Sequence, residues 1–169
     1  MKIEDNFLEQ KVFDELQTLI MGGDFAWYFN STIVYDEDTS DRFQFTHMFY
    51  AGAAPRSEFL DQLTPIIEII KPISLWRIKA NLLTRTSNII ENRFHSDLEN
   101  ILPKEKLKQW TTSIFYMGTN NGYTKFEDGT KVESVANRMV SFPANIKHRG
   151  TSCTDEKTRV VINFNYFKK

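Results

Sequence analysis

The hydrophobic positions of the chain follow a helical period at its beginning and a strand period over most of the rest. Between residues 6 and 21 the apolar side chains recur every three or four positions, which predicts an amphipathic helix with Asp5 or Asn6 as its cap. A second helical pattern covers residues 57–70, where Pro65 is expected to kink or divide the helix. Two helical segments are therefore expected in the first 70 residues.

Most other segments alternate apolar and polar residues, which is the pattern of half-buried strands, and turn-forming residues separate them. The expected strands are 25–35, 42–52, 74–84, 93–97, 111–117, 122–127, 130–135, 138–143, 147–151 and 158–167, with a helical turn at 104–110. Helices followed by many short strands predict an α+β, mainly β protein. The expected fold is a double-stranded β-helix, or jelly roll, whose N-terminal helices cover one sheet. An open α+β sandwich without a cavity is the alternative.

The length and composition narrow the class of protein. A chain of 169 residues fits a single domain, in which residues 1–72 support a β-helix core at 73–169. The net charge of −1 disfavours binding to nucleic-acid backbones. A single cysteine suits a reducing compartment, and no apolar run resembles a signal peptide or a membrane span. We therefore expect a cytoplasmic protein without membrane contact.

Two of the expected strands have one apolar face and one face with polar residues of an unusual kind. These polar residues are Arg77, Lys79 and Asn81 in 74–84, and Arg159, Asn163 and Asn165 in 158–167. A polar face commonly meets water, but arginine and asparagine also suit a barrel interior that holds a small anionic ligand. Arg159 is the expected anion-binding residue, because a guanidinium forms paired hydrogen bonds with a carboxylate.

A metal site is indicated by the segment His95-Ser96-Asp97. In extended backbone this spacing places His95 and Asp97 on the same side, with Cα atoms roughly 6 to 7 Å apart. His148 lies far downstream, just after a predicted turn. Two imidazoles and one carboxylate form the facial triad of non-heme Fe(II) oxygenases, which leaves coordination positions open for a cosubstrate and dioxygen. The remaining histidine, His47, is expected to be a cross-strand or surface residue, with a substrate contact as the alternative.

Together these residues resemble the HxD…H…R signature of the 2-oxoglutarate- and Fe(II)-dependent dioxygenases, and most closely the prolyl-4-hydroxylase-like branch. The resemblance covers about residues 73–167. RIKANLL at 77–83 is similar to the first barrel strand of that branch, and TRVVINFNYF is similar to its final strand. GYTKFEDGTKVES at 122–134 resembles a glycine-rich turn region whose first glycine is Asn121 here. Prolyl hydroxylases proper often have lysine where this chain has Arg159, so prolyl specificity does not follow from the resemblance.

The resemblance implies that His95, Asp97 and His148 hold Fe(II) and that Arg159 binds the distal carboxylate of 2-oxoglutarate. It further implies hydrogen bonds to this cosubstrate from Asn81, Tyr116, Thr151 and Asn163, and substrate contacts from Arg77, Lys79 and Arg93. The implied activity is a dioxygenase that uses O2, with ascorbate as reductant, and releases succinate and carbon dioxide while it hydroxylates a substrate. Peptidyl proline or another amino-acid-like group is favoured as that substrate.

Two other functions fit parts of the sequence. A non-catalytic jelly-roll module could bind a sugar or a peptide through the polar face, and it would not need the two histidines and the aspartate together. A metal-binding cupin with different chemistry usually brings more histidines to its metal, and only His47 could be added here. The loops at 36–41 and 85–92 are expected to influence the choice of substrate. The acidic residues of the first loop are expected to be solvated, because they lack the spacing of a calcium site.

Overall fold

The computed structural model describes residues 1–33, 42–99 and 102–168. The acidic loop at 36–41 therefore lies outside the described residues. In chain order the elements are β1 (Lys2–Glu4), α1 (Gln10–Ile20), β2 (Tyr28–Asn30), β3 (Gln44–Ala51), β4 (Ala54–Pro55), the 3-10 helix η1 (Glu58–Leu63), α2 (Thr64–Ile70), β5 (Ser74–Thr84), α3 (Lys104–Leu107), β6 (Trp110–Tyr116), β7 (Asn120–Phe126), β8 (Lys131–Ser134), β9 (Arg138–Pro143), β10 (His148–Gly150) and β11 (Thr158–Phe167).

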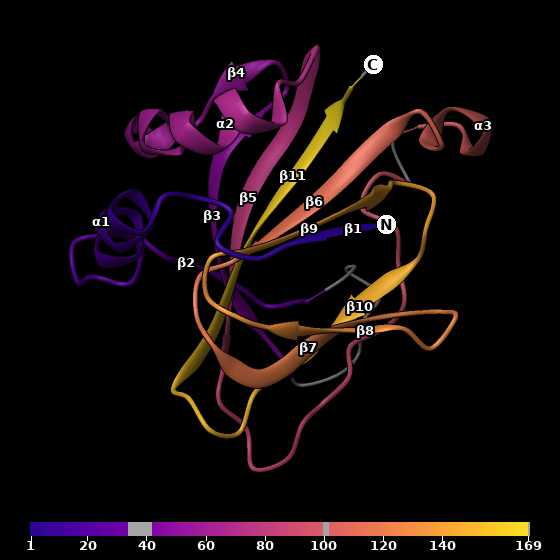
Figure 1. The fold of residues 1–169 in the computed structure, drawn as a ribbon. Coiled ribbons are helices and arrows are strands. Elements are labelled where there is room, and N and C mark those ends of the chain that lie inside the picture. Colours follow the sequence, from indigo (N-terminus) through magenta and orange to yellow (C-terminus); the bar gives the residue numbers. More distant parts are fainter. Residues whose placement is uncertain (34–41, 100–101, 169) are drawn as a thin grey trace.

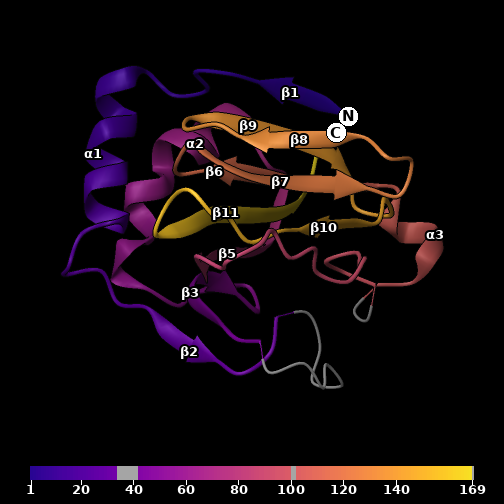
Figure 2. The same cartoon turned by 90° about the horizontal axis from the view of Figure 1, so that it is seen from below.

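The strands form two antiparallel sheets. The larger sheet follows the order β1-β9-β6-β11-β5-β3-β2, with β4 paired to β3. Figure 2 shows the strands in this spatial order, from β1 at the top to β2 at the bottom. The smaller sheet has the order β10-β7-β8. Helices α1 and α2 lie on one side of the larger sheet and the smaller sheet lies on the other (Figure 1). The predicted jelly roll with N-terminal helices over one sheet is confirmed.

The two faces of β5 and β11 have different surroundings, as their alternating pattern predicted. Ile78 and Ala80 of β5, together with Ile162 and Phe164 of β11, are completely buried against the residues of α1 and α2. Full burial of a large aliphatic or aromatic side chain contributes about 1.5–3 kcal/mol, so this cluster fixes the helices on the sheet. The opposite face of both strands points into the space between the two sheets, where it lines a pocket.

Helix α1 begins later than the hydrophobic period predicted, because the residues before it are held by Asn137. The N–H of Leu8 donates to Oδ1 of Asn137, and Nδ2 of Asn137 donates to the Leu8 carbonyl, each over 2.9 Å. Glu9 caps the helix by accepting a backbone N–H of the first turn, whereas Asp5 and Asn6 precede the cap. The residues before them form β1, which the period did not predict and which pairs with β9.

Most of the other helical and strand predictions are confirmed, three strands with the predicted limits and the rest with shorter or shifted ones. Pro65 stands at the start of α2 and divides the second helical segment into η1 and α2, as expected. In the described part of the strand predicted at 25–35, only β2 is a strand, and Phe25 is buried in the core before it. Within the described residues no helix has both the length and the apolar character that crossing a membrane requires.

His47 is a buried packing residue of β3. Its Nδ1–H donates to the carbonyl of Ala26 over 2.7 Å, and its Nε2 lies 2.7 Å from the hydroxyl of Ser57. The imidazole lies against the ring of Phe25, with 4.3 Å between the centroids. Both nitrogens are therefore used inside the fold, and His47 joins β3 to its neighbours instead of facing a substrate.

Candidate functional site

His95, Asp97 and His148 converge on one point. One ligand atom from each residue lies within 4.8 Å of the other two. Nε2 of His95 is 3.6 Å from Oδ1 of Asp97, and the centroids of the two imidazoles are 4.8 Å apart. With small side-chain adjustments, two nitrogens and one carboxylate oxygen at these separations are able to bind a single metal ion.

The backbone brings the two histidines together through a pair of reciprocal hydrogen bonds. The N–H of His95 donates to the His148 carbonyl over 3.0 Å, and the N–H of His148 donates back over 2.9 Å. This contact is an isolated bridge beside β10, so the segment 93–97 is not the strand that was predicted. The chain leaves the sheet after one bridged residue, because a turn starts at Asp97 and buries Leu98 completely.

Backbone carbonyls take up Nδ1 of both imidazoles, which leaves Nε2 for a metal. Nδ1 of His95 lies 3.2 Å from the Arg93 carbonyl, and Nδ1 of His148 lies 3.5 Å from the Ile146 carbonyl. A carbonyl oxygen only accepts, so Nδ1 carries the hydrogen in each ring. Burial lowers the pKa of His148 to about 4, although the charge of Asp97 opposes this. The imidazole is therefore neutral at neutral pH, as a metal ligand must be.

Two polar side chains hold the carboxylate of Asp97. Nδ2 of Asn165 donates to its Oδ2 over 2.9 Å, and Nη2 of Arg77 lies 3.4 Å from its Oδ1. Nε of Arg77 also donates to Oδ1 of Asn165 over 3.1 Å, so the two partners fix each other. Burial raises the pKa of Asp97, but the neighbouring imidazole of His95 and the charge of Arg77 outweigh it. The resulting pKa lies well below the usual value, and the group is anionic.

Arg159 is a buried cation in the same pocket, with 3% of its surface exposed. Its Nε donates to the Ser134 hydroxyl over 2.8 Å, and its Nη2 donates to the Thr124 hydroxyl over 3.2 Å. Both partners are neutral, and no described acidic residue pairs with the guanidinium. Burial accordingly lowers the pKa of Arg159 from its ordinary value. A ligand carboxylate facing this side chain would supply the missing negative charge.

Glycines leave the space that Arg159 occupies. A Cβ at Gly122 would lie 2.6 Å from Cδ of Arg159 and 2.8 Å from the Ser152 carbonyl oxygen. A Cβ at Gly150 would lie 3.3 Å from Nη1 of Arg159. Any side chain at Gly122 would therefore push Arg159 away from its partners, which gives this glycine a physical role in the site.

One pocket between the sheets contains the three converging residues, Arg159 and most of the predicted polar face. Its volume is about 140 Å³. This is small beside the roughly 300–1,000 Å³ of sites for drug-sized ligands, so the pocket suits a small molecule. Of the residues predicted to contact cosubstrate or substrate, those that line it are Arg77, Lys79, Asn81, Arg159 and Asn163. The β5–β11 register explains this grouping, because it pairs Lys79 with Asn163 and Leu83 with Arg159.

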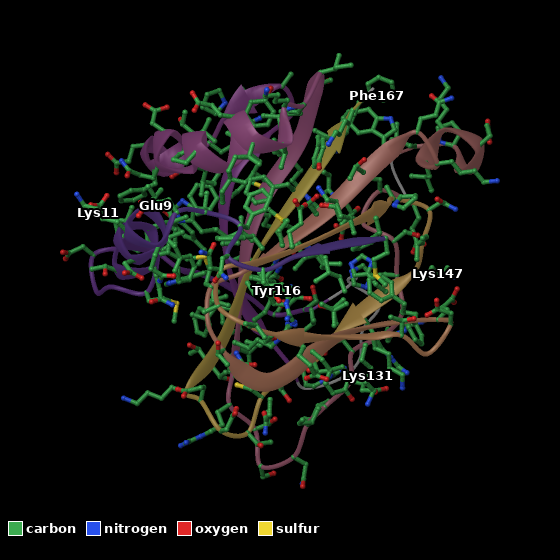
Figure 3. All side chains as sticks on the ribbon, in the orientation of Figure 1. Glu9, Lys11, Tyr116, Lys131, Lys147 and Phe167 are labelled. Carbon is green, nitrogen blue, oxygen red and sulfur yellow. The ribbon has the colours of Figure 1, made fainter. Side chains whose placement is uncertain are left out.

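The other predicted contact residues, Tyr116, Thr151 and Arg93, do not line the pocket. Tyr116 lies near the centre of the molecule (Figure 3), where its hydroxyl donates to Thr124 over 2.8 Å. The guanidinium of Arg159 lies over the Tyr116 ring, with its central carbon 5.7 Å from the ring centroid, so Tyr116 supports that side chain. The hydroxyl of Thr151 accepts a backbone N–H of β7 over 2.9 Å and serves the local backbone, and Arg93 is exposed.

The reasoning from sequence assigned no individual role to three site residues: Asn165, Thr124 and Ser134. Asn165 follows the same two-residue period as Arg159 and Asn163, so this period already pointed to it. Thr124 and Ser134 belong to the smaller sheet. They reach Arg159 only because that sheet packs over β11. No sequence pattern predicts this contact.

Comparisons with solved structures define the fold. A prolyl hydroxylase from Trichoplax adhaerens, solved with a peptide fragment of hypoxia inducible factor, matches with a TM-score of 0.68 and 13% identity, over 98% of this chain and 82% of that one. The viral collagen prolyl hydroxylase of Paramecium Bursaria Chlorella virus-1, in complex with 2-oxoglutarate, matches with a TM-score of 0.57 and 15% identity, over 99% and 96%. This chain has the prolyl hydroxylase fold.

The chain is also similar to solved structures that are not named as prolyl hydroxylases. HygX from Streptomyces hygroscopicus, solved with nickel and 2-oxoglutarate bound, matches with a TM-score of 0.61 and 10% identity, over 99% of this chain and 82% of that one. No family model matches the sequence, and no curated protein matches it. At such low identities the likeness establishes the fold, and the chemistry has to follow from the residues of the site.

Proposed function

We propose that this protein is an Fe(II)- and 2-oxoglutarate-dependent dioxygenase that hydroxylates an amino-acid-like substrate. One observation carries the proposal: the converging His95, Asp97 and His148 share a pocket with the buried Arg159, which lacks a counterion among the described residues. A metal triad or a buried arginine alone fits many proteins. Together they fit a ligand with a metal-chelating group at one end and a carboxylate at the other, which describes 2-oxoglutarate.

The residues present fit both the metal and the cosubstrate. Two neutral imidazoles and one anionic carboxylate are the donor set of non-heme Fe(II) oxygenases. Only three positions of a six-coordinate ion are then filled by protein, so a bidentate cosubstrate and dioxygen have room. The guanidinium of Arg159 is suited to paired hydrogen bonds with a carboxylate. The bound 2-oxoglutarate in two proteins of the same fold supports this assignment.

Fe(II), together with 2-oxoglutarate and dioxygen, supplies the oxidising chemistry that hydroxylates a C–H bond and releases succinate and carbon dioxide, with ascorbate as reductant. The protein's own residues position the reactants. His95, His148 and Asp97 present their donor atoms from one side of the pocket, and Arg77 and Asn165 keep the carboxylate in place. Arg159 binds the distal carboxylate and so fixes the direction in which the cosubstrate lies.

A screen for succinate release tests this proposal. The protein, Fe(II), ascorbate and 2-oxoglutarate are incubated with separate pools of peptides, amino acids, nucleotides and small metabolites, and succinate is measured with and without each pool. Asp97→Ala removes the anionic ligand and should abolish release. Lys11→Met, on the outer side of α1 (Figure 3), should leave it unchanged. Undiminished release by Asp97→Ala would exclude the triad as the catalytic metal site.

A further inference from the structure

Lys79 is a cation of the pocket that the proposed metal and cosubstrate do not use. It projects from β5 into the pocket, and its ammonium forms neither a hydrogen bond nor an ion pair with any described residue. Among the described residues that line the pocket, Asp97 is the only acid. The Asp97 carboxylate is already engaged by Arg77 and Asn165. Lys79 therefore faces the pocket without a negative partner in the described part of the chain.

A second polar group without a partner lies beside Lys79. Asn163 is its register partner on β11, and both side chains line the pocket. Oδ1 of Asn163 is buried and accepts no hydrogen bond from any residue that the structure describes. A buried acceptor left in this state costs free energy, on the order of 1–3 kcal/mol, unless a ligand satisfies it. An unpaired donor and an unpaired acceptor on neighbouring strands therefore form a small polar site.

The charges of the pocket show what this site lacks. The described lining residues carry three cations, Arg77, Lys79 and Arg159, against the single anion Asp97, an excess of two positive charges when both histidines are neutral ligands. A divalent metal and the dianion 2-oxoglutarate cancel each other, so the excess persists in the loaded pocket. Low-dielectric surroundings make such an excess costly. The ligand that is still missing is therefore negatively charged.

The position of Lys79 separates it from the place of the distal carboxylate. Along β5, Lys79 stands two residues from Arg77, which contacts Asp97, and four residues from Leu83, which pairs with Arg159. At about 3.3 Å per residue these spacings are roughly 7 Å and 13 Å. Burial, and then the charge of Arg77, lower the pKa of Lys79 to about 8. A carboxylate at this point would relieve the unfavourable surroundings of the ammonium.

We propose that Lys79 and Asn163 bind the carboxylate end of the substrate, so that the substrate is a small carboxylic acid, such as a free amino acid, and not an internal residue of a polypeptide. Lys79 pairs with the carboxylate, and Oδ1 of Asn163 accepts a hydrogen bond from an ammonium or hydroxyl group of the same molecule. This inference rests on the proposed function, because placing the two carboxylates of 2-oxoglutarate at the metal and at Arg159 is what leaves Lys79 unused.

Binding of matched acids and amides tests the inference. Protein loaded with Mn²⁺ and 2-oxoglutarate under nitrogen is titrated with L-proline, L-leucine and 4-methylpentanoic acid, and with the primary amide of each, in a calorimeter. We expect at least one acid to bind the wild-type protein ten times more tightly than its amide, or better, because the amide has no charge for Lys79. Lys79→Met should remove this discrimination, Lys79→Arg should keep part of it, and the control Lys11→Met should leave it unchanged.

Several outcomes would overturn the inference. Equal affinities for acid and amide, or no binding of any acid up to its solubility, would exclude a carboxylate site for the substrate. A Lys79→Met protein that loses affinity for 2-oxoglutarate while still discriminating acid from amide would assign Lys79 to the cosubstrate instead. The proposed function fails in a different way: the Mn²⁺-loaded wild-type protein would not bind 2-oxoglutarate at all. The two failures are therefore distinguishable in one set of titrations.

Discussion

Asn165 donates a 2.9 Å hydrogen bond to Asp97, although 68 residues separate them in the chain. Asn165 is completely buried, and it also receives a hydrogen bond from Arg77. The carboxylate of Asp97 thus has a fixed orientation before any metal binds. Partners of this kind, one step behind a metal ligand, commonly change metal affinity by about 10–100-fold when they are removed.

Asn165→Ala should weaken both the fold and the metal site. The substitution leaves Oδ2 of Asp97 and Nε of Arg77 without their partner inside the fold, which costs about 1–3 kcal/mol of unfolding free energy. Mn²⁺ affinity should fall about tenfold or more. Urea unfolding and a Mn²⁺ titration at a temperature where both proteins are folded measure the two effects. Wild-type Mn²⁺ affinity in the variant would show that Asn165 does not position the ligand.

Gly122→Ala should displace Arg159. The new Cβ would meet Cδ of Arg159 at 2.6 Å and the backbone carbonyl of Ser152 at 2.8 Å, and the backbone has little freedom to yield. We expect a loss of about 1–3 kcal/mol in unfolding free energy and a clear loss of 2-oxoglutarate affinity. Gly118→Ala is the matched control, because nothing lies within 4 Å of its Cβ position.

Urea unfolding and calorimetry of 2-oxoglutarate binding to the Mn²⁺-loaded proteins distinguish these two glycine variants. If Gly122→Ala binds the cosubstrate as tightly as Gly118→Ala does, Arg159 is not its anchor.

The metal-free protein should lose stability between pH 7 and pH 5 because of His148. The pKa of His148 is lowered from 6.5 to about 4 in the folded protein, so the unfolded chain takes up a proton first as the pH falls. Stability is therefore fully present above the unfolded pKa and declines as the pH drops toward the folded pKa. The linkage relation gives about 2 kcal/mol at pH 5. The lowered pKa of Asp97 acts in the same direction, but only near and below pH 3.8.

Urea unfolding with a chelator present, at both pH values, checks this contribution. His148→Phe retains an aromatic ring beside Phe126 and Phe142, whose centroids lie 6.3 Å and 4.9 Å from that of His148, and it cannot titrate. The two proteins differ in this one titratable group, so the difference between them reports on His148. The same decrease in stability in the wild-type protein and in His148→Phe would refute the assignment.

Much of the fold could be predicted from the period of the hydrophobic residues, because burial determines which face of β5 and β11 is turned toward the helices. The wholly apolar face of both strands lies toward the helices, and the face that carries the polar residues lies toward the pocket, as the two-residue alternation required. Local alternation does not report contacts between distant segments. Asn137 delays the start of α1, and a single bridge replaces the strand predicted at 93–97. Both depend on partners that lie far away in the chain.

The part of the site that could be predicted consists of residue types that are rare in this chain and that bind metals. His95, Asp97 and His148 are found from residue type and spacing, and the structure brings them to one point. Their placement supports the proposed iron site, which the experiments above would establish. Tyr116 shows where such reasoning ends. It was a candidate for contact with the cosubstrate, but its hydroxyl is taken by Thr124 of the smaller sheet.

The central claim is that the pocket binds Fe(II) and 2-oxoglutarate together. Anaerobic addition of 2-oxoglutarate to the Fe(II)-loaded protein, followed by visible absorption, tests it most directly, because chelation of Fe(II) by a 2-oxo acid produces a charge-transfer band. We expect a saturable band in the wild-type protein, a band that saturates only at higher concentrations in Arg159→Met, and no band in Asp97→Ala. A wild-type protein without the band, or an Asp97→Ala protein with an undiminished one, would contradict the account.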